Sequence, residues 1–317
     1  MLEAMPNRSG AIDLVRIIAV AAIVAGHAFT REVTADWLYT WHVTVFFVIS
    51  GYLWKPGRSP GTELRRRWRS LGRPYLVWFV LLTIALLAMG FEDTPSRILG
   101  GIYGGGVAGM PYITLWFIST LFFTALLLRL IERLPLGVQW LIGIAGAVAG
   151  WIGGTVFSDS PLGIGLAVTS LIYLLIGDGL RRTRSRIPAP AVIGILLIAV
   201  SAALIATGTS SFLDMKQGEF GTPVLSLLVS AAISIGLILL AESIVRPGRF
   251  SQLCTLLALP LLTVVLMHPI FLWTPWPGWL TFIAAMLVPL LVGLMALRTP
   301  ASPWLTGQPA VRTDSGG

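Results

Sequence analysis

Three residues that can carry a charge lie within one apolar stretch near the start of the sequence, AIDLVRIIAVAAIVAGH at residues 11–27. An ionisable group inside such a stretch is a functional candidate, because its burial in hydrocarbon costs free energy. On a helix, the 11 residues from Arg16 to His27 rotate to within about 20° of three full turns and rise about 16 Å. Asp13 lies one turn before Arg16 and about 40° from the same line. The spacing predicts one helix face with an ion pair at one end and an imidazole at the other.

The sequence contains three histidines, and we expect all of them in the outer halves of membrane spans. His42 lies in WHVTVFFVISGYLW and His268 lies in VLMHPIF. A neutral imidazole can accept or donate a proton near physiological pH, as general base catalysis requires. A zinc site is the alternative, but the three histidines lack metal-ligand spacing, so no metal is predicted.

The densest group of cations is RRRWRSLGR at residues 65–73. Arginine binds phosphate well because its guanidinium is planar and weakly hydrated. Together with Arg16, this segment predicts a polyanion site that opens to the cytoplasm. The alternative is that an inner loop collects arginine only to set topology. A ligand suited to both the arginines and a distant histidine is a nucleotide with a long arm and a reactive tip, such as acyl-coenzyme A.

Composition indicates the elements that must hold these residues. The chain has 317 residues, of which 56% are hydrophobic and 11% are charged, and its mean hydropathy is +0.84. Soluble domains carry about 25% charged residues, so we predict an all-α polytopic membrane protein. A single cysteine, Cys254, excludes an internal disulfide framework. Ten stretches are long enough to cross about 30 Å of hydrocarbon; they are 11–30, 38–54, 74–90, 112–130, 138–157, 162–180, 189–207, 222–241, 253–272 and 279–297.

The net charge of +8 is explained by membrane topology rather than by nucleic-acid binding. If the N-terminus is cytoplasmic and ten spans cross, all Lys and Arg residues except Arg16, Arg31, Arg97 and Lys216 fall on the inner side. The positive-inside rule favours this arrangement, which predicts that both termini are cytoplasmic. Residues 299–317 are rich in Pro, Ser, Thr and Gly and are predicted to form a disordered tail.

Several segments together resemble acyltransferase family 3, the membrane-bound O-acyltransferases of bacterial envelope glycans and glycolipids. The resemblance covers most of the first 130 residues and one late helix. Its matches are the arginine, ten residues, histidine pattern of Arg16 and His27; the Ser-Gly-Tyr-Leu that ends WHVTVFFVISGYLW; the Arg-x-x-Arg of Arg66 and Arg69 before Pro74; LWFISTLFF at 115–123; and, more weakly, VLMHPIF.

The resemblance implies a transmembrane acyltransferase domain over residues 1–298, in the inner membrane of a bacterium. The donor would be cytoplasmic acyl-CoA, and the acyl group, commonly acetyl, would go to a hydroxyl of a cell-envelope glycan or glycolipid. His27 would be the catalytic histidine. Arg16, Arg66 and Arg69 would belong to the donor site, where we also place Arg73. Asp13 is too far from His27 to orient it, so we expect it to hold Arg16.

We expect His27 to take the proton of the acceptor hydroxyl as that oxygen attacks the thioester. Direct transfer is favoured over an acyl-enzyme, because the only cysteine, Cys254, is predicted at the inner end of the ninth span, far from His27. Candidates for stabilising the oxyanion are His42, Ser50 and the indole N–H of Trp116. We assign His268 to the acceptor substrate.

Each of these assignments has a structural alternative. Ser50 and Gly51 suit close helix packing, and tryptophan is common at membrane interfaces. His268 precedes Pro269 and can bond a carbonyl that the proline leaves free. For the whole chain, the alternative function is a sugar or lipid transporter or flippase, with GGIYGGG at 100–106 as a hinge. A structural subunit is a third possibility, but it requires no histidine.

Overall fold

The computed structural model describes residues 8–29 and 34–311, and within these ranges the chain is helical and contains no strand. Seven helical segments are long and apolar enough to cross a membrane, which confirms an all-α polytopic fold. They are Gly10–Ala28, Pro60–Met89, Leu136–Gly153, Pro161–Arg186, Leu225–Ile244, Arg249–Trp273 and Gly278–Ala296. Two shorter apolar helices, α7 (Leu115–Ile131) and α11 (Pro190–Ala206), match two further predicted spans.

The predicted span 38–54 differs most from its expected form. It consists of a π-helical turn, η1 (Ala35–Tyr39), and a separate helix of nine residues, α3 (Thr44–Tyr52). Nine residues rise about 14 Å, roughly half of the hydrocarbon layer. Helix α3 alone is therefore too short to cross, so the predicted span is an interrupted helix made of η1, a turn and α3, and His42 lies in the irregular turn before α3.

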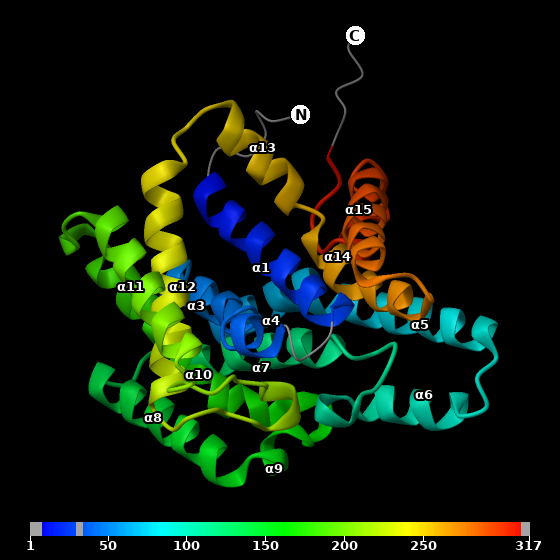
Figure 1. Ribbon diagram of the computed structural model, residues 1–317, viewed down its shortest axis with the longest axis horizontal. Coiled ribbons are helices and arrows are strands. Elements are labelled where there is room, and N and C mark those ends of the chain that lie inside the picture. Colours follow the sequence, from blue (N-terminus) through cyan, green and yellow to red (C-terminus); the bar gives the residue numbers. More distant parts are fainter. Residues whose placement is uncertain (1–7, 30–33, 312–317) are drawn as a thin grey trace.

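Helix α1 (Gly10–Ala28) crosses the centre of the molecule (Figure 1). It contacts α12 (Leu225–Ile244) on one side and α14 (Leu261–Met267) and α15 (Gly278–Ala296) on the other. Its first turn packs against α13 (Arg249–Ala258). The Ser9 hydroxyl caps the helix by accepting a bond from the N–H of Ile12. Protein surrounds α1 on most sides, so its polar residues face the interior of the bundle rather than lipid.

Helices α3 and α10 (Ile164–Thr183) cross at very close range. A Cβ atom on Gly51 would lie 1.9 Å from the carbonyl oxygen of Leu174, and one on Gly177 would lie 2.0 Å from that of Val48. No side chain fits at either distance. The crossing confirms the packing role that small residues commonly have between membrane helices.

The remaining elements complete the bundle around α1, α3 and α10. Figure 1 shows α11 and α12 together on one flank, α5 and α6 on the other, and α8 beside α10. Their bounds are α4 Pro60–Arg67, η2 Trp68–Gly72, α5 Arg73–Met89, α6 Thr94–Tyr103, η3 Gly105–Val107, α8 Leu136–Gly153, α9 Thr155–Ser158, η4 Pro161–Gly163, η5 Arg184–Arg186, η6 Met215–Gln217 and η7 His268–Trp273.

The glycine-rich stretch at 100–106 is closely packed, in contrast to the hinge of the transporter alternative. A Cβ on Gly105 would lie 2.5 Å from the carbonyl oxygen of Ser160, and Gly105 has φ +60°. A Cβ on Gly106 would lie 2.6 Å from a carboxylate oxygen of Asp159. These glycines allow two loops to approach each other closely.

The C-terminal segment differs from the disordered tail that the sequence predicts. Residues 299–311 fold back on the bundle through α16 (Ser302–Leu305), where Ser302 is fully buried. The indole of Trp78 donates a hydrogen bond of 2.9 Å to the carbonyl of Leu305, and the N–H of Val311 donates one of 2.8 Å to the carbonyl of Leu297. Residues 312–317 lie outside the described residues.

Candidate active site

His27 faces a cavity of about 210 Å³, which we call the histidine cavity. Its wall combines residues from α1, the turn before α3, the start of α7 and the η6 loop. The polar and aromatic members that matter for chemistry are His27, Tyr39, His42, Thr114, Trp116 and Lys216. Two of the three histidines predicted as site residues therefore line one space, together with the predicted Trp116.

The third histidine, His268, lies directly against His27. Nδ1 of His27 is 2.9 Å from Nε2 of His268, and the two rings are within 13° of parallel. Nδ1 of His268 is 3.1 Å from the carbonyl oxygen of Val264, which can only accept a hydrogen bond. His268 thus carries its proton on Nδ1, and its Nε2 accepts the bond that His27 donates from Nδ1. Nε2 of His27 keeps its lone pair, as a general base requires.

This pairing changes the interpretation of His268. The sequence assigns it to the acceptor substrate, whereas the structure buries it completely behind His27. Its bond to the Val264 carbonyl agrees with the alternative reading of a histidine that satisfies backbone near Pro269. Both contacts together make His268 a residue that orients His27.

His42 is also fixed by a backbone contact. Its Nδ1 is 2.6 Å from the carbonyl oxygen of Leu38, so the proton is on Nδ1 and Nε2 is an acceptor. The ring of Tyr39 packs edge-on against it, and the Tyr39 hydroxyl donates to the carbonyl of Gly26 on α1. In this tautomer His42 has no N–H left for an oxyanion. The predicted oxyanion role does not fit, and His42 can instead accept a hydrogen bond from a hydroxyl.

Thr114 is a residue of the histidine cavity that the sequence analysis does not identify. It precedes α7, and its hydroxyl makes no cap bond to that helix. Its Oγ1 is buried and has no hydrogen-bond partner within the described residues. A buried hydroxyl without a partner costs free energy, which a bound ligand can recover. Nothing in the sequence distinguishes Thr114 from an ordinary helix cap.

The η6 loop closes another side of the histidine cavity. Lys216 donates a 2.8 Å hydrogen bond from Nζ to the carbonyl oxygen of Gly106, which joins η6 to the η3 loop. Burial lowers the pKa of Lys216, and the carboxylates of Asp214 and Asp159 oppose that shift. Lys216 therefore holds two loops together beside the cavity.

Arg16 lines a second cavity of about 450 Å³, which we call the arginine cavity. Asp13, nearly fully buried, accepts a 2.7 Å bond from Nη1 of Arg16 and a 2.9 Å bond from Nη2 of Arg8. The predicted pairing of Asp13 with Arg16 is confirmed. Arg66 lines the same cavity and also an adjoining cavity of about 430 Å³, which contains Arg65 and Arg69 and which we call the annex.

The cations of residues 65–73 have three different environments. Arg65, Arg66 and Arg69 face the annex, and no ion pair joins Arg66 or Arg69 to a carboxylate in the part of the chain that the structure describes. Arg67 points into the protein. Arg73 packs over the ring of Trp304 at 5.1 Å and lines neither cavity, so its assignment to the donor site is not supported.

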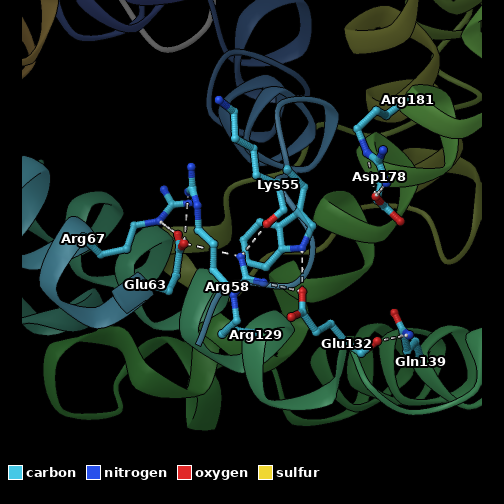
Figure 2. A network of polar contacts seen from close by, with 10 residues as sticks. Lys55, Arg58, Glu63, Arg67, Arg129, Glu132, Gln139, Asp178 and Arg181 are labelled. Carbon is cyan, nitrogen blue, oxygen red and sulfur yellow. Dashed lines mark hydrogen bonds and ion pairs between the residues drawn. The ribbon is translucent and has the colours of Figure 1, made fainter. Parts of the chain in front are cut away.

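A buried network of charges holds α4 against α7 and α3 (Figure 2). Glu63 is fully buried and accepts a 2.8 Å bond from Nε of Arg67 and a 3.4 Å bond from Nη2 of Arg129. Arg129 also pairs with Glu132, donates to the carbonyl of Lys55, and stacks on Trp54 at 4.1 Å. The network fixes the position of α4. Arg66, which precedes Arg67 on this helix, lines the arginine cavity.

Ser50 belongs to this network and not to the histidine cavity. Its hydroxyl accepts a 3.1 Å bond from Nη2 of Arg67. The structure does not bring Ser50 together with His27, so the predicted oxyanion role does not fit. The physical reason is that Ser50 and Gly51 lie at the α3–α10 crossing, beside the anchored end of α4.

One face of α1 connects the two cavities. Arg16 and Val20 line the arginine cavity, and Ile23 and His27 line the histidine cavity. Among the described residues, Phe117 and Val265 alone contribute to the walls of both. The predicted alignment of Arg16 and His27 along one helix face is therefore confirmed, with a cavity at each end.

Within the described residues, no group of three or more His, Cys, Asp or Glu side chains could hold a metal ion. The one cysteine, Cys254, is buried in α13, the helix against the first turn of α1.

The chain belongs to acyltransferase family 3, since the family model described as an acyltransferase domain matches residues 9–298, nearly its whole length. The match, with the helical segments above, identifies a multi-pass membrane acyltransferase. No curated protein and no solved structure matches the chain.

Proposed function

We propose that this protein transfers an acyl group, typically acetyl, from cytoplasmic acyl-CoA to a hydroxyl of a cell-envelope glycan or glycolipid in a bacterial inner membrane. The observation that carries the proposal is the pair of cavities along α1. One cavity is lined by arginines and suits a polyphosphate, and the other contains an imidazole with a free lone pair.

The arginine cavity and its annex hold the nucleotide part of the donor. Five arginines and one aspartate line them, a formal excess of four positive charges. Guanidinium groups without carboxylate partners are available to form bidentate bonds with phosphate oxygens. Coenzyme A carries a diphosphate and a further phosphate at one end of a long flexible arm, so its thiol end extends along α1 toward His27.

The arginine end of α1 faces the cytoplasm in this proposal, with ten crossings of the membrane. Arg8 and Gln308, close to the two described ends of the chain, line the same cavity. This supports an even number of crossings and both termini on one side. The surplus of arginine at that end agrees with the positive-inside rule.

His27 is the general base. Its Nε2 accepts the proton of the acceptor hydroxyl while the hydroxyl oxygen bonds to the carbonyl carbon of the thioester. The carbon–sulfur bond then breaks, and the coenzyme A thiolate takes the proton from Nε2 as it leaves. The products are an ester and a free thiol, and the imidazole is neutral again. His268 holds His27 in the required tautomer through the whole cycle.

The hydroxyl of Thr114 and the indole N–H of Trp116 are the donors proposed for the oxyanion that forms on the thioester oxygen. Both residues line the histidine cavity, and the Thr114 hydroxyl has no competing partner in the described structure. Donors that are fixed before the reaction stabilise a developing charge better than groups that must reorganise.

The test is a transfer assay with the purified protein in lipid nanodiscs. Acetyl-CoA labelled in the acetyl group is added with an envelope lipid extract, and both free thiol and labelled lipid are measured. We expect thiol and labelled lipid in equal amounts, with both formed about 10²- to 10⁴-fold more slowly in His27→Ala. Binding of coenzyme A by calorimetry should persist in His27→Ala and weaken in Arg16→Ala. Transfer at the normal rate by His27→Ala would overturn the mechanism, and absence of coenzyme A binding would overturn the donor.

A further inference from the structure

The two cavities are separated at a single level of the bundle. Phe117 on α7 and Val265 on α14 are the residues that both cavities share, and their side chains are 6% and 4% exposed. On α1, the boundary falls between Val20 and Ile23, only about 4.5 Å along the helix axis. Any ligand that reaches from Arg16 to His27 must pass Phe117 and Val265.

The two residues differ in how far they can move. Val265 is β-branched and stiff, and it lies in a helix packed against α15 and α1. Phe117 packs against aromatic rings from α3, with centroids 5.3 Å from Phe46 and 5.9 Å from Phe47. Phe46 itself lines the arginine cavity and is only half-buried, so open space lies next to the Phe117 ring on that side. Phe117 also lines the arginine cavity itself, so displacement of its ring into that cavity would open a passage.

We propose that Phe117, closing against Val265, is the gate between the arginine cavity and the histidine cavity. Closed, it separates water and ions on the two sides of the membrane. Open, it admits one narrow chain past the ring, and its bulk limits the size of the acyl group that can follow. The limit on the size of the acyl group rests on the proposed acyl transfer, whereas the separation of the two sides of the membrane does not.

The separation can be measured without any enzyme activity. The single cysteine Cys254 is buried and is replaced by serine, after which either Arg16→Cys or His27→Cys is introduced as a probe. Vesicles of both orientations are treated with a small methanethiosulfonate that carries a fixed positive charge and does not cross lipid. We expect each probe to react from one side only, and the two probes from opposite sides.

Adding Phe117→Ala should make each probe react from both sides. Because a closed gate leaves the open form as a minor state, labelling from the second side should rise about tenfold or more. Phe117→Leu should give an intermediate rate, which also covers the case in which the alanine variant does not fold. The matched control is Phe122→Ala, since Phe122 lies on the same helix but lines a separate apolar cavity. Labelling of either probe at similar rates from both sides while Phe117 is present would overturn the gate.

The acyl-size part is tested by the ratio of butyryl to acetyl transfer. We expect the ratio to rise in Phe117→Ala and to stay unchanged in Phe122→Ala. An unchanged ratio in Phe117→Ala overturns this part. If no variant and no parent transfers acyl groups, the proposed function has failed, while the one-sided labelling still decides the gate.

Discussion

The two cavities along α1 use buried polar groups in opposite ways. Around the arginine cavity, guanidinium groups either pair with carboxylates, as Arg16 does with Asp13, or line the cavity with no ion pair to a described carboxylate, as Arg66 does. Around the histidine cavity, the histidines bond to backbone carbonyls and to each other. The first region presents positive charge toward a cavity, and the second region fixes the position of the lone pair on Nε2 of His27. Under the proposed function, donor binding and proton transfer are therefore separated along one helix.

Replacing the proton acceptor should have the largest effect and should separate the two regions. His27→Ala should lower the transfer rate about 10²- to 10⁴-fold, the contribution typical of general base catalysis. Coenzyme A binding should change less than twofold, because no donor-site arginine is altered. The measurements are initial rates of labelled acetyl transfer and calorimetric titration. A parallel loss of binding and transfer would mean that the two regions are not independent.

Thr114→Val should have the next largest effect. Valine has the same shape without the hydroxyl, so the loss of one oxyanion donor should lower kcat up to about 10²- to 10³-fold. Stability should not fall, since the hydroxyl has no partner to lose in the described structure. Rates and thermal unfolding are measured on the same preparation. A lower transition temperature with normal kcat would show that Thr114 is only structural.

Removing an unpaired arginine should act on binding alone. Arg66→Ala should weaken coenzyme A binding by about 1.5–3 kcal/mol, the usual value of a hydrogen bond to a charged group. The effect should diminish at high ionic strength because the interaction is between charges. Arg73→Ala is the matched control, since Arg73 stacks on Trp304 outside both cavities. Equal losses in the two variants would contradict a site specific to the cavity-lining arginines.

The buried network should affect binding only through the position of α4. Glu63→Gln removes the carboxylate that Arg67 and Arg129 share, and we expect coenzyme A binding to weaken by about 0.5–2 kcal/mol. The rate constant at saturating donor should stay close to that of the parent protein. Calorimetry and saturation kinetics measure both quantities. If kcat falls while binding is normal, the network serves the chemistry and not the donor site.

The sequence predicts those features that depend on local geometry. Arg16 and His27 lie on one helix, so their common face follows from the helical repeat, and the pairing of Asp13 with Arg16 follows from the same rule. The helical membrane fold follows from composition. By contrast, the predicted span 38–54 is not one continuous α-helix, because η1 and the turn after it interrupt the apolar run before α3.

Residues that depend on tertiary contacts could not be predicted in this way. His268 is 241 residues from His27, and no sequence pattern places one ring against the other. Packing also decides the roles of three arginines that look equivalent in the sequence. Arg66 faces a cavity, Arg67 binds Glu63, and Arg73 stacks on Trp304. Thr114 gave no signal because its missing cap bond is visible only in three dimensions.

The contact between His27 and His268 has a consequence for biosynthesis. His27, the proposed general base, is made early, on the first helix, while His268, which contacts it, is made near the end of the chain. Because synthesis proceeds from the N-terminus, a ribosome-bound chain lacks the hydrogen-bond partner of His27 Nδ1 until η7, which begins with His268, has been made. The tautomer of His27 is therefore fixed only after most of the chain has been synthesised.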